Sequence, residues 1–130
     1  LMFDEVPVSN GNSAVAQCAQ KQLGKPYVAG ATGPNSFDCS GLVQFCYKKA
    51  GMSIPRVSRD QCAKGRQISQ SQAQPGDPIC FYRPGQPVHH VGIVVSSTDM
   101  IHAPHTGDVV RRASQQSQGK SVNIKYVTFS

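Results

Sequence analysis

The sequence has no tryptophan, few charged residues and no long apolar run. A transmembrane helix needs about 18 or more consecutive apolar residues, and no stretch of the chain comes near that length. We therefore expect no insertion into a membrane. Residues 1–12 lack the basic segment and long apolar stretch of a targeting signal, and we interpret them as a linker or the remnant of an upstream segment. Residues 13–130 then make one domain.

Charge is sparse and does not cluster. Lysine and arginine number 13 against 7 aspartate and glutamate, a net charge of +6, but only 15% of the residues are charged. A nucleic-acid-binding protein gathers its basic residues in a patch or stripe, whereas the densest groups here are Lys48–Lys49 and Arg111–Arg112. We expect no nucleic-acid partner. The positive charge favours, at most, attraction to anionic substrates such as cell-wall polymers.

The five cysteines include no C-x-x-C pair, since their spacings are 21, 7, 16 and 18 residues. A structural zinc site of the common kind is therefore not expected. An odd count leaves one thiol over if the others pair, and such a thiol is either buried and inert or reactive. Cys18 and Cys46 fall on apolar helical faces and Cys80 in an apolar strand, so we interpret them as core residues. The role of Cys62 stays open.

The first half of the chain has the periodicity of helices. The first helix is expected to follow Ser13 as its N-cap and to end before Gly24. A short helix is expected over residues 58–64, where Ser58 and Gln61 match a capping box. The apolar face of the first helix is predicted to consist of Val15, Cys18, Ala19 and Leu23.

The clearest helix lies between these two. Ser36 or Asp38 can cap its N-terminus, and Gly51 ends it after two lysines in the last turn. Its apolar residues recur at helical spacing: Leu42, Val43, Cys46 and Ala50.

The second half has the pattern of short strands separated by turns. Strands are predicted over residues 79–82, 90–96, 100–103, 109–111 and 122–129. Helices followed by a run of strands indicate an α+β fold with an antiparallel sheet.

Cys39 is the candidate nucleophile. It lies at the expected start of the clearest helix, directly after residues 24–37, a loop rich in glycine and proline. A helix N-terminus carries partial positive charge and free N–H groups, which favour a thiolate over a thiol. The small neighbours Ser40 and Gly41 leave room for a substrate, whereas a structural cysteine is normally surrounded by bulky side chains.

A cysteine nucleophile needs a base within hydrogen-bond reach, and the predicted strands supply histidines. His89 and His90 are adjacent in a strand, so their side chains point to opposite faces and only one can meet Cys39. His102 ends the next strand, which a short turn can bring beside His90. His105 follows in a turn and is expected to be exposed.

Five motifs occur in a fixed order: Tyr27, Asp38-Cys39-Ser40-Gly41, Pro75-Gly76-Asp77, His90-Val91-Gly92-Ile93 and Ile101-His102-Ala103. In this order and spacing they resemble the NlpC/p-sixty family of papain-like cysteine peptidases, over roughly residues 13–129. The resemblance implies a papain-like α+β fold, with N-terminal helices and the nucleophile helix packed on a C-terminal antiparallel sheet. Pro78 and Cys80 depart from the family's usual strand residues.

The resemblance also implies roles for individual residues. Cys39 corresponds to the nucleophile, His90 to the general base, and His102 to the polar residue that orients His90. Tyr27 corresponds to the tyrosine whose hydroxyl is expected near the oxyanion. Substrate-binding positions are implied at Asp38, Ser40, Arg56 and Ser58. For Asp38 a plain helix cap, for Arg56 a solvated charge and for Ser58 a cap of the short helix are the alternatives.

The function implied is hydrolysis of peptidoglycan by a cysteine endopeptidase, at the γ-D-glutamyl–diamino acid bond of the stem peptide. We expect a monomer that needs no cofactor or metal and acts on peptidoglycan or muropeptides outside the cell, in the cell wall or a compartment that meets it. Four alternatives remain open: an N-acetylmuramoyl-L-alanine amidase of the related CHAP type, a lipid acyltransferase, a non-catalytic wall-binding module, and a metal site built from the histidines with a cysteine.

Overall fold

The computed structural model describes residues 10–130. Three helices come first: α1 (Asn10–Lys21), α2 (Cys39–Lys49) and α3 (Ser58–Lys64). The strands are β2 (Arg66–Ile68), β3 (Pro78–Tyr82), β4 (His90–Val94), β5 (Asp99–His102), β6 (Arg111–Ser114) and β7 (Asn123–Thr128), with the 3-10 helix η1 (Gln70–Gln72) after β2. All pairings are antiparallel, in the order β2-β7-β3-β4-β5-β6. The predicted α+β class is confirmed.

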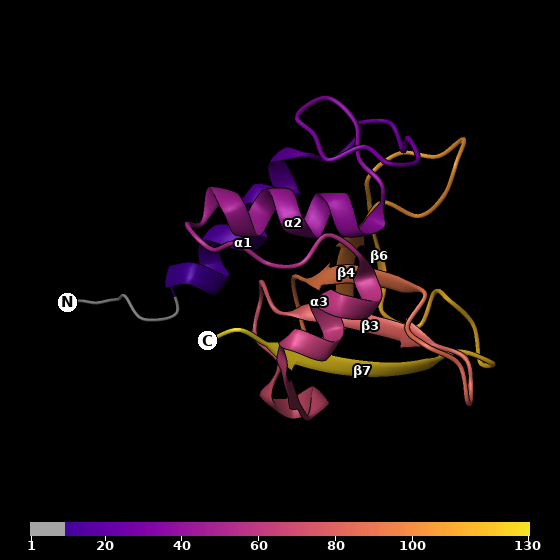
Figure 1. Ribbon diagram of the computed structural model, residues 1–130. Coiled ribbons are helices and arrows are strands. Elements are labelled where there is room, and N and C mark those ends of the chain that lie inside the picture. Colours follow the sequence, from indigo (N-terminus) through magenta and orange to yellow (C-terminus); the bar gives the residue numbers. More distant parts are fainter. Residues whose placement is uncertain (1–9) are drawn as a thin grey trace.

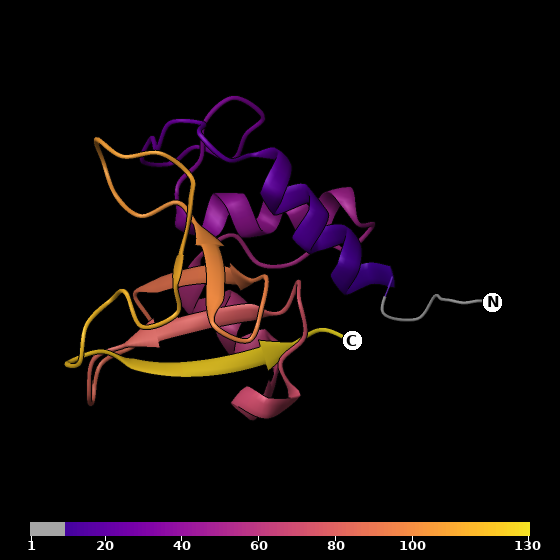
Figure 2. The same cartoon turned by 180° about the vertical axis from the view of Figure 1, so that it is seen from behind.

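The helices lie on one side of the sheet. In Figures 1 and 2, α1 and α2 run across each other above the strands, and α3 lies against the sheet beside them. The main core fills the space between these helices and the strands. Its completely buried members include Val15 from α1, Leu42 and Val43 from α2, and Val91 and Ile93 from β4. The helix that begins with Cys39 is thereby packed directly on the strand that begins with His90.

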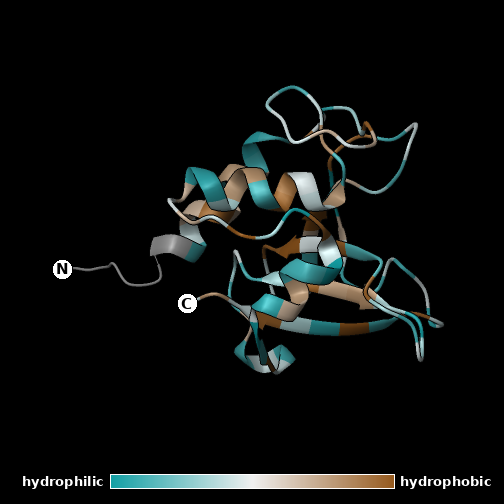
Figure 3. Ribbon diagram, viewed as in Figure 1, coloured by the Kyte–Doolittle hydropathy of each residue, from teal (hydrophilic) through white to brown (hydrophobic). Residues whose placement is uncertain are grey.

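A second, smaller core lies on the opposite face of the sheet. Alternation along the strands sends Ile79, Phe81, Val94 and Met100 to this face. Because both faces of β4 are covered, all five of its residues are buried, and the strand is mostly brown in the hydropathy view of Figure 3. A strand that is packed on both faces gives His90 a fixed position.

The predicted helices are present, but the predicted start of the first helix, burial of Leu23 and capping box of the third helix are wrong. Residues 10–12 belong to helix α1 and not to the expected linker, and residues 1–9 lie outside the described residues. Helix α1 thus begins at Asn10, so Ser13 lies inside it and is not its N-cap. It ends at Lys21, and Leu23 in the following turn is 43% exposed. Helix α3 has the predicted limits but no capping box, because Val57 precedes it and Gln61 turns into the interior. No helix among residues 10–130 is long and apolar enough to span a bilayer.

The predicted strands are also present, with one shifted and one missed. The strand expected at residues 109–111 begins only at Arg111. Val109 instead forms an isolated bridge to Pro26, which ties the loop before Cys39 to the segment after β5. The missed strand is β2, a polar edge strand of three residues that pairs with β7.

Four of the five cysteines form disulfides. Cys18 pairs with Cys46, joining α1 to α2, and Cys62 pairs with Cys80, joining α3 to β3. Cys18, Cys46 and Cys80 are all buried, as expected of core residues, but their disulfide bonds were not predicted. The second disulfide also explains why Cys80 stands in β3 where the family usually has another strand residue. Cys39 is the one free cysteine.

Candidate active site

Cys39 is the first residue of α2, and Asp38 is the N-cap of that helix. The Asp38 backbone is extended (φ −97°, ψ −179°), and its Oδ1 accepts a hydrogen bond from the backbone N–H of Gly41 at 2.7 Å. Of the two caps that the sequence offered, Asp38 is thus the one used. The cap fixes the first turn of the helix and holds the half-buried Cys39 thiol at its end.

Gly41 allows the loop before the helix to approach it closely. A Cβ at this position would lie 2.1 Å from the backbone oxygen of Ala31 and 2.8 Å from Asp38 Oδ1. The loop is held there by the Asp38 N–H, which donates to the Ala31 oxygen at 2.9 Å, and by the Gly30 N–H, which donates to Asp38 Oδ2 at 3.0 Å. The small residue after Ser40 therefore serves the packing of this loop.

Tyr27 is carried by the same loop. Its N–H donates to the Asp108 carbonyl at 3.0 Å, and the neighbouring Val28 and Pro26 are hydrogen-bonded to the backbone of Phe37. Burial raises the pKa of Tyr27, and the nearby Cys39 and Asp38 raise it further. The hydroxyl is therefore protonated at neutral pH and is available as a hydrogen-bond donor beside the thiol.

His90 and His102 are brought together by the neighbouring strands β4 and β5. His90 Nε2 and His102 Nδ1 are 2.8 Å apart, and both side chains are buried. Only one of the two adjacent histidines is buried, as expected, but His89 lies just before β4 and is exposed rather than pointing to the other face of the strand. The predicted exposure of His105 is also found, with 72% of its side chain accessible.

Gly92 explains why the two histidine strands lie so close. A Cβ on Gly92 would meet Met100 Sδ at 3.0 Å and His102 Cβ at 3.2 Å. Only a glycine leaves the room that β5 needs at this point of the sheet. The glycine of the His90-Val91-Gly92-Ile93 motif therefore allows the contact between the rings.

The Cys39 thiol lies close to the backbone amide of Val91, the residue after His90, and this N–H lowers its pKa. The N–H groups of Ser40 and Cys39 at the helix N-terminus act in the same direction. Burial nevertheless raises the thiol's pKa above its ordinary value, and the Asp38 carboxylate adds to that rise. The expected net preference for a thiolate is therefore wrong for the resting site, because loss of water outweighs the helix N-terminus.

Both histidines are neutral in the folded protein. Burial lowers the pKa of His90 to about 3, and the neighbouring His102 and His89 lower it further. Burial likewise lowers the pKa of His102 to about 4, although the Asp108 carboxylate opposes this effect. A neutral His90 whose Nε2–H donates to His102 has an unprotonated Nδ1, which is the state that can accept a proton from a thiol.

Arg56, Asp38 and Ser40 form one polar cluster beside the thiol. The Arg56 guanidinium contacts both carboxylate oxygens of Asp38, at 3.2 and 2.8 Å, and donates to Ser40 Oγ at 2.8 Å. Burial raises the pKa of Asp38, but the hydrogen bonds from Arg56, Gly41 and Gly30 outweigh it and hold that pKa below its ordinary value. Asp38 is thus both a helix cap and an ion-pair partner, and Arg56 is not a freely solvated charge.

Gln61 supports this cluster through hydrogen bonds, whereas Ser58 does not. Ser58 begins α3 and is half-buried, with no side-chain hydrogen bond to any part of the chain that the structure describes. Gln61 is completely buried, and its Nε2 donates to the carbonyls of Ser40, at 3.0 Å, and Pro55, at 2.8 Å. Sequence reasoning missed this support of Ser40, since a glutamine in a helix gives no signal of a tertiary partner.

The alternative metal site is not supported by the geometry. His90 and His102 meet, whereas His89 and His105 are exposed. Residues 10–130 contain no group of three histidine, cysteine, aspartate or glutamate side chains positioned to hold one ion. The structure contains a thiol at a helix N-terminus, a hydrogen-bonded pair of imidazoles on the neighbouring strands β4 and β5, and a protonated tyrosine beside the thiol.

A family model described as NlpC/P60 family matches residues 24–128. The chain belongs to the NlpC/P60 family. The "Probable endopeptidase p60" of Listeria monocytogenes is 48% identical over 89 residues, which is 68% of this chain and 18% of that protein. A "Probable endopeptidase" of Corynebacterium glutamicum is 42% identical over 97 residues, which is 75% of this chain and 45% of that one. The chain therefore spans less than half of either relative.

Solved NlpC/P60 structures have the same fold. The NlpC/p60 domain of the peptidoglycan hydrolase SagA superposes with a TM-score of 0.78 at 34% identity, covering 91% of this chain and 98% of that one. NlpC2 from Trichomonas vaginalis superposes with a TM-score of 0.83 at 29% identity, covering 96% of this chain and 49% of that one. The papain-like fold that the motifs implied is confirmed.

Proposed function

We infer that the protein is a cysteine endopeptidase that hydrolyses an amide bond in the stem peptide of peptidoglycan. The observation that carries this inference is the His90–His102 hydrogen bond of 2.8 Å, on the strand whose Val91 amide lies at the Cys39 thiol. Membership of the NlpC/P60 family and similarity to a domain of a peptidoglycan hydrolase support the substrate class.

The reaction starts from a neutral thiol and a neutral imidazole. His90 Nδ1 takes the proton of Cys39 as Sγ attacks the carbonyl carbon of the scissile amide, because neither group is charged in the resting site. His102 accepts the His90 Nε2–H and so keeps the ring in the tautomer that accepts the proton. The charge that develops on the carbonyl oxygen is stabilised by the Tyr27 hydroxyl and the Cys39 N–H.

Collapse of the tetrahedral intermediate breaks the amide C–N bond. The imidazolium of His90 returns its proton to the departing amine, which leaves an acyl thioester on Cys39. Water then attacks the thioester carbonyl, with His90 again accepting a proton, and the free acid and the thiol are released. The protein's own side chains supply every proton transfer in this sequence.

For the scissile bond we propose the γ-D-glutamyl–diamino acid bond, with Asp38, Ser40, Arg56 and Ser58 along the substrate. The cluster of Asp38, Ser40 and Arg56 lies beside the nucleophile and offers both charges and a hydroxyl to a peptide. Because Arg56 already pairs with Asp38, a substrate amine at Asp38 would share the carboxylate with the guanidinium. Cleavage between muramic acid and L-alanine is the competing reaction.

We further propose that the protein acts outside the cell or in another oxidising compartment that meets bacterial wall. Two disulfides support this location, since structural disulfides persist where thiols are not kept reduced. Four of the five cysteines are bonded in this way, which leaves Cys39 as the one free thiol.

The test is digestion of purified peptidoglycan and of a defined muropeptide by the wild type and by Cys39→Ala. We expect the variant to release less than about 0.1% of the wild-type product, because loss of a nucleophile removes the covalent route. Masses of the fragments identify the bond: a new N-terminus on the diamino acid supports the endopeptidase, and free L-alanine at the N-terminus supports the amidase. Equal release by both proteins would contradict Cys39 as the nucleophile, and no release by either protein would leave a wall-binding module as the function.

A further inference from the structure

We propose that a groove between α1, α2 and the loop before Cys39 binds a linear, phosphate-bearing polymer of the cell wall. This inference goes beyond the catalytic site but rests on the proposed function, because it assumes that the protein works on bacterial wall. The groove is called the α1–α2 groove below. Its basic residues are Lys21, Lys25, Lys48 and Lys49.

Two adjoining hollows make up the α1–α2 groove. One has a volume of about 470 Å³ and is lined in part by Lys21, Lys25 and Lys49. The other, of about 670 Å³, lies between Lys48 and the Pro34 region of the loop. Phe45 and Lys49 line both hollows, so the two lie next to each other on the surface. A groove of this extent is larger than one phosphate needs and suits a chain with repeated charges.

The lysines of the groove have no acidic partners in the part of the chain that the structure describes. Within residues 10–130, each carboxylate is either next to an arginine or, in the case of Asp77, buried. The arginine pairs are Asp38–Arg56, Asp60–Arg59, Asp99–Arg112 and Asp108–Arg111. No residue that lines either hollow is acidic. Four of the seven lysines therefore line one groove without an acidic partner among the described residues.

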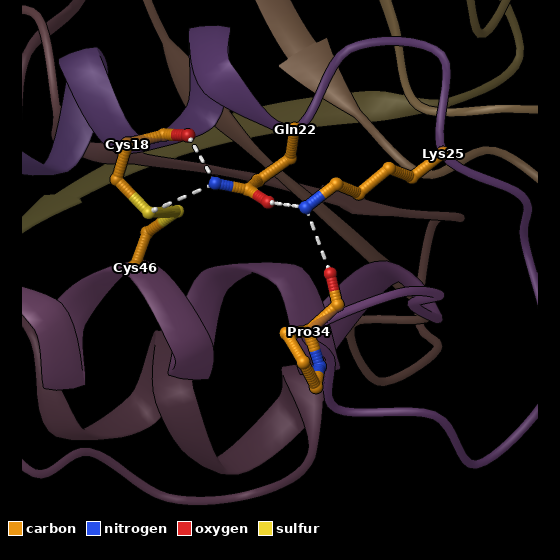
Figure 4. Close-up of a disulfide and its surroundings, with 5 residues drawn as sticks. All are labelled: Cys18, Gln22, Lys25, Pro34 and Cys46. Carbon is orange, nitrogen blue, oxygen red and sulfur yellow. Dashed lines mark hydrogen bonds between the residues drawn. A yellow bond between two sulfur atoms is a disulfide. The ribbon is translucent and has the colours of Figure 1, made fainter.

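Lys25 is held in place rather than free to swing into solvent. Its Nζ donates to Gln22 Oε1 at 2.6 Å and to the Pro34 carbonyl at 2.8 Å, and Gln22 in turn donates to the Cys18 carbonyl at 3.0 Å (Figure 4). The Cys18–Cys46 disulfide lies at one end of this chain of hydrogen bonds, next to the Gln22 amide. A fixed ammonium group loses little freedom on binding an anion, which favours binding.

The character of the groove favours a wall polymer over a nucleic acid. All four of its charges are lysines, which contact phosphates as compact point charges, and no arginine offers a planar fork for a base edge. Its one aromatic ring, Phe45, packs edge-on against Phe37 at 5.1 Å, and the Lys49 ammonium lies 5.4 Å from the ring's centre. The Lys49 ammonium over the Phe45 ring and the single aromatic residue make the groove a poor platform for the base stacking that single-stranded nucleic acids need.

The groove and the catalytic thiol are at different places along α2. Lys48 and Lys49 end the helix that Cys39 begins, and this helix is 11 residues long. At a rise of 1.5 Å per residue, the two ends are roughly 15 Å apart. A polymer in the α1–α2 groove would thus hold the enzyme on the wall without covering the thiol.

The experiment measures binding of the whole chain to soluble poly(glycerol phosphate) by isothermal calorimetry at low and at moderate salt. The groove variant is Lys21→Gln/Lys48→Gln/Lys49→Gln, which spares the hydrogen-bonded Lys25. The matched control, Lys64→Gln/Lys120→Gln/Lys125→Gln, removes the same charge elsewhere. We expect the groove variant to bind about tenfold more weakly, the effect of losing three exposed ion pairs, and the control to stay within about twofold of the wild type.

Two outcomes would overturn the proposal. Equal weakening in the groove variant and the control would mean that the polymer responds only to net charge. Tighter binding of a single-stranded DNA than of poly(glycerol phosphate), lost in the groove variant, would assign the groove to nucleic acid. Hydrolysis of a small soluble muropeptide is measured in parallel and should be the same in all three proteins. If the wild type fails to cleave it, the proposed catalytic function fails, while the binding assay still decides the groove.

Discussion

At the scale of single residues, the buried histidines make the fold sensitive to acid. Folding lowers the pKa of His90 to about 3 and that of His102 to about 4. At a pH below about 6.5, the ordinary pKa of histidine, these two histidines become protonated in the unfolded chain but stay neutral in the folded chain. This part of the stability is therefore complete above about pH 6.5 and falls by about 1.4 kcal/mol per pH unit for each proton as the pH drops toward 4.

Urea unfolding at a series of pH values between about 7 and 4.5 measures this slope. In His102→Gln one of the two protonation steps is missing, so its stability should fall more gently with decreasing pH than that of the wild type. The comparison depends on the two slopes and not on the absolute stabilities, which keeps it valid if the variant is weaker at every pH. Parallel curves for the two proteins would show that His102 is not held neutral by the fold.

Gly41 sets the distance between α2 and the loop that carries Tyr27. Alanine in place of glycine inside a helix ordinarily stabilises it by roughly 0.5–1 kcal/mol. In Gly41→Ala the new Cβ meets the Ala31 backbone oxygen at 2.1 Å, which a backbone atom cannot relieve without moving the loop. We expect a net loss of about 1–3 kcal/mol in the free energy of unfolding, and a fall in kcat/KM as Tyr27 shifts. Chemical denaturation and muropeptide hydrolysis measure the two effects, and a stabilised variant would contradict the close contact.

At the scale of elements, local rules in the sequence predict the helix that carries the nucleophile. Asp38 as a cap, the apolar spacing that follows and a glycine after the last turn all act within a few residues of one another. The same local reasoning fails for α1, where packing continues the helix back to Asn10 and overrides Ser13 as a cap. It fails for the Gln61 capping box because a buried side chain finds tertiary carbonyls instead.

Features that depend on distant partners could not be predicted from the sequence. The edge strand β2 is short and polar, and only its pairing with β7 makes it a strand. The histidine pair was predictable as a meeting of two strands, since the turn between them is short. The protonation state of Cys39 was not, because the helix N-terminus is a local feature whereas burial depends on the whole site. Which cysteines pair is likewise fixed by how α1, α2, α3 and β3 pack.

At the scale of the whole molecule, the two disulfides fasten the helices to each other and to the sheet. Cys18–Cys46 joins α1 to α2 across 28 residues, and Cys62–Cys80 joins α3 to β3 across 18. Closing loops of these lengths removes conformational freedom from the unfolded chain and stabilises the fold by about 3 kcal/mol each. Because α2 supplies the nucleophile and also lines the α1–α2 groove, the first disulfide supports both sites.

The last prediction therefore concerns the pair of variants Cys18→Ala/Cys46→Ala and Cys62→Ala/Cys80→Ala. Each should unfold with a free energy about 3 kcal/mol below that of the wild type, measured by urea denaturation under non-reducing conditions. The hydrolysis rate per folded molecule should change little at temperatures far below unfolding, since neither bond includes the nucleophile Cys39. A reductant should remove both bonds from the wild type and only the remaining bond from a variant, so the wild type loses about twice as much stability and the reduced proteins become similar. Wild-type and variant curves that coincide before reduction would show that the bonds add nothing to the packed helices and sheet.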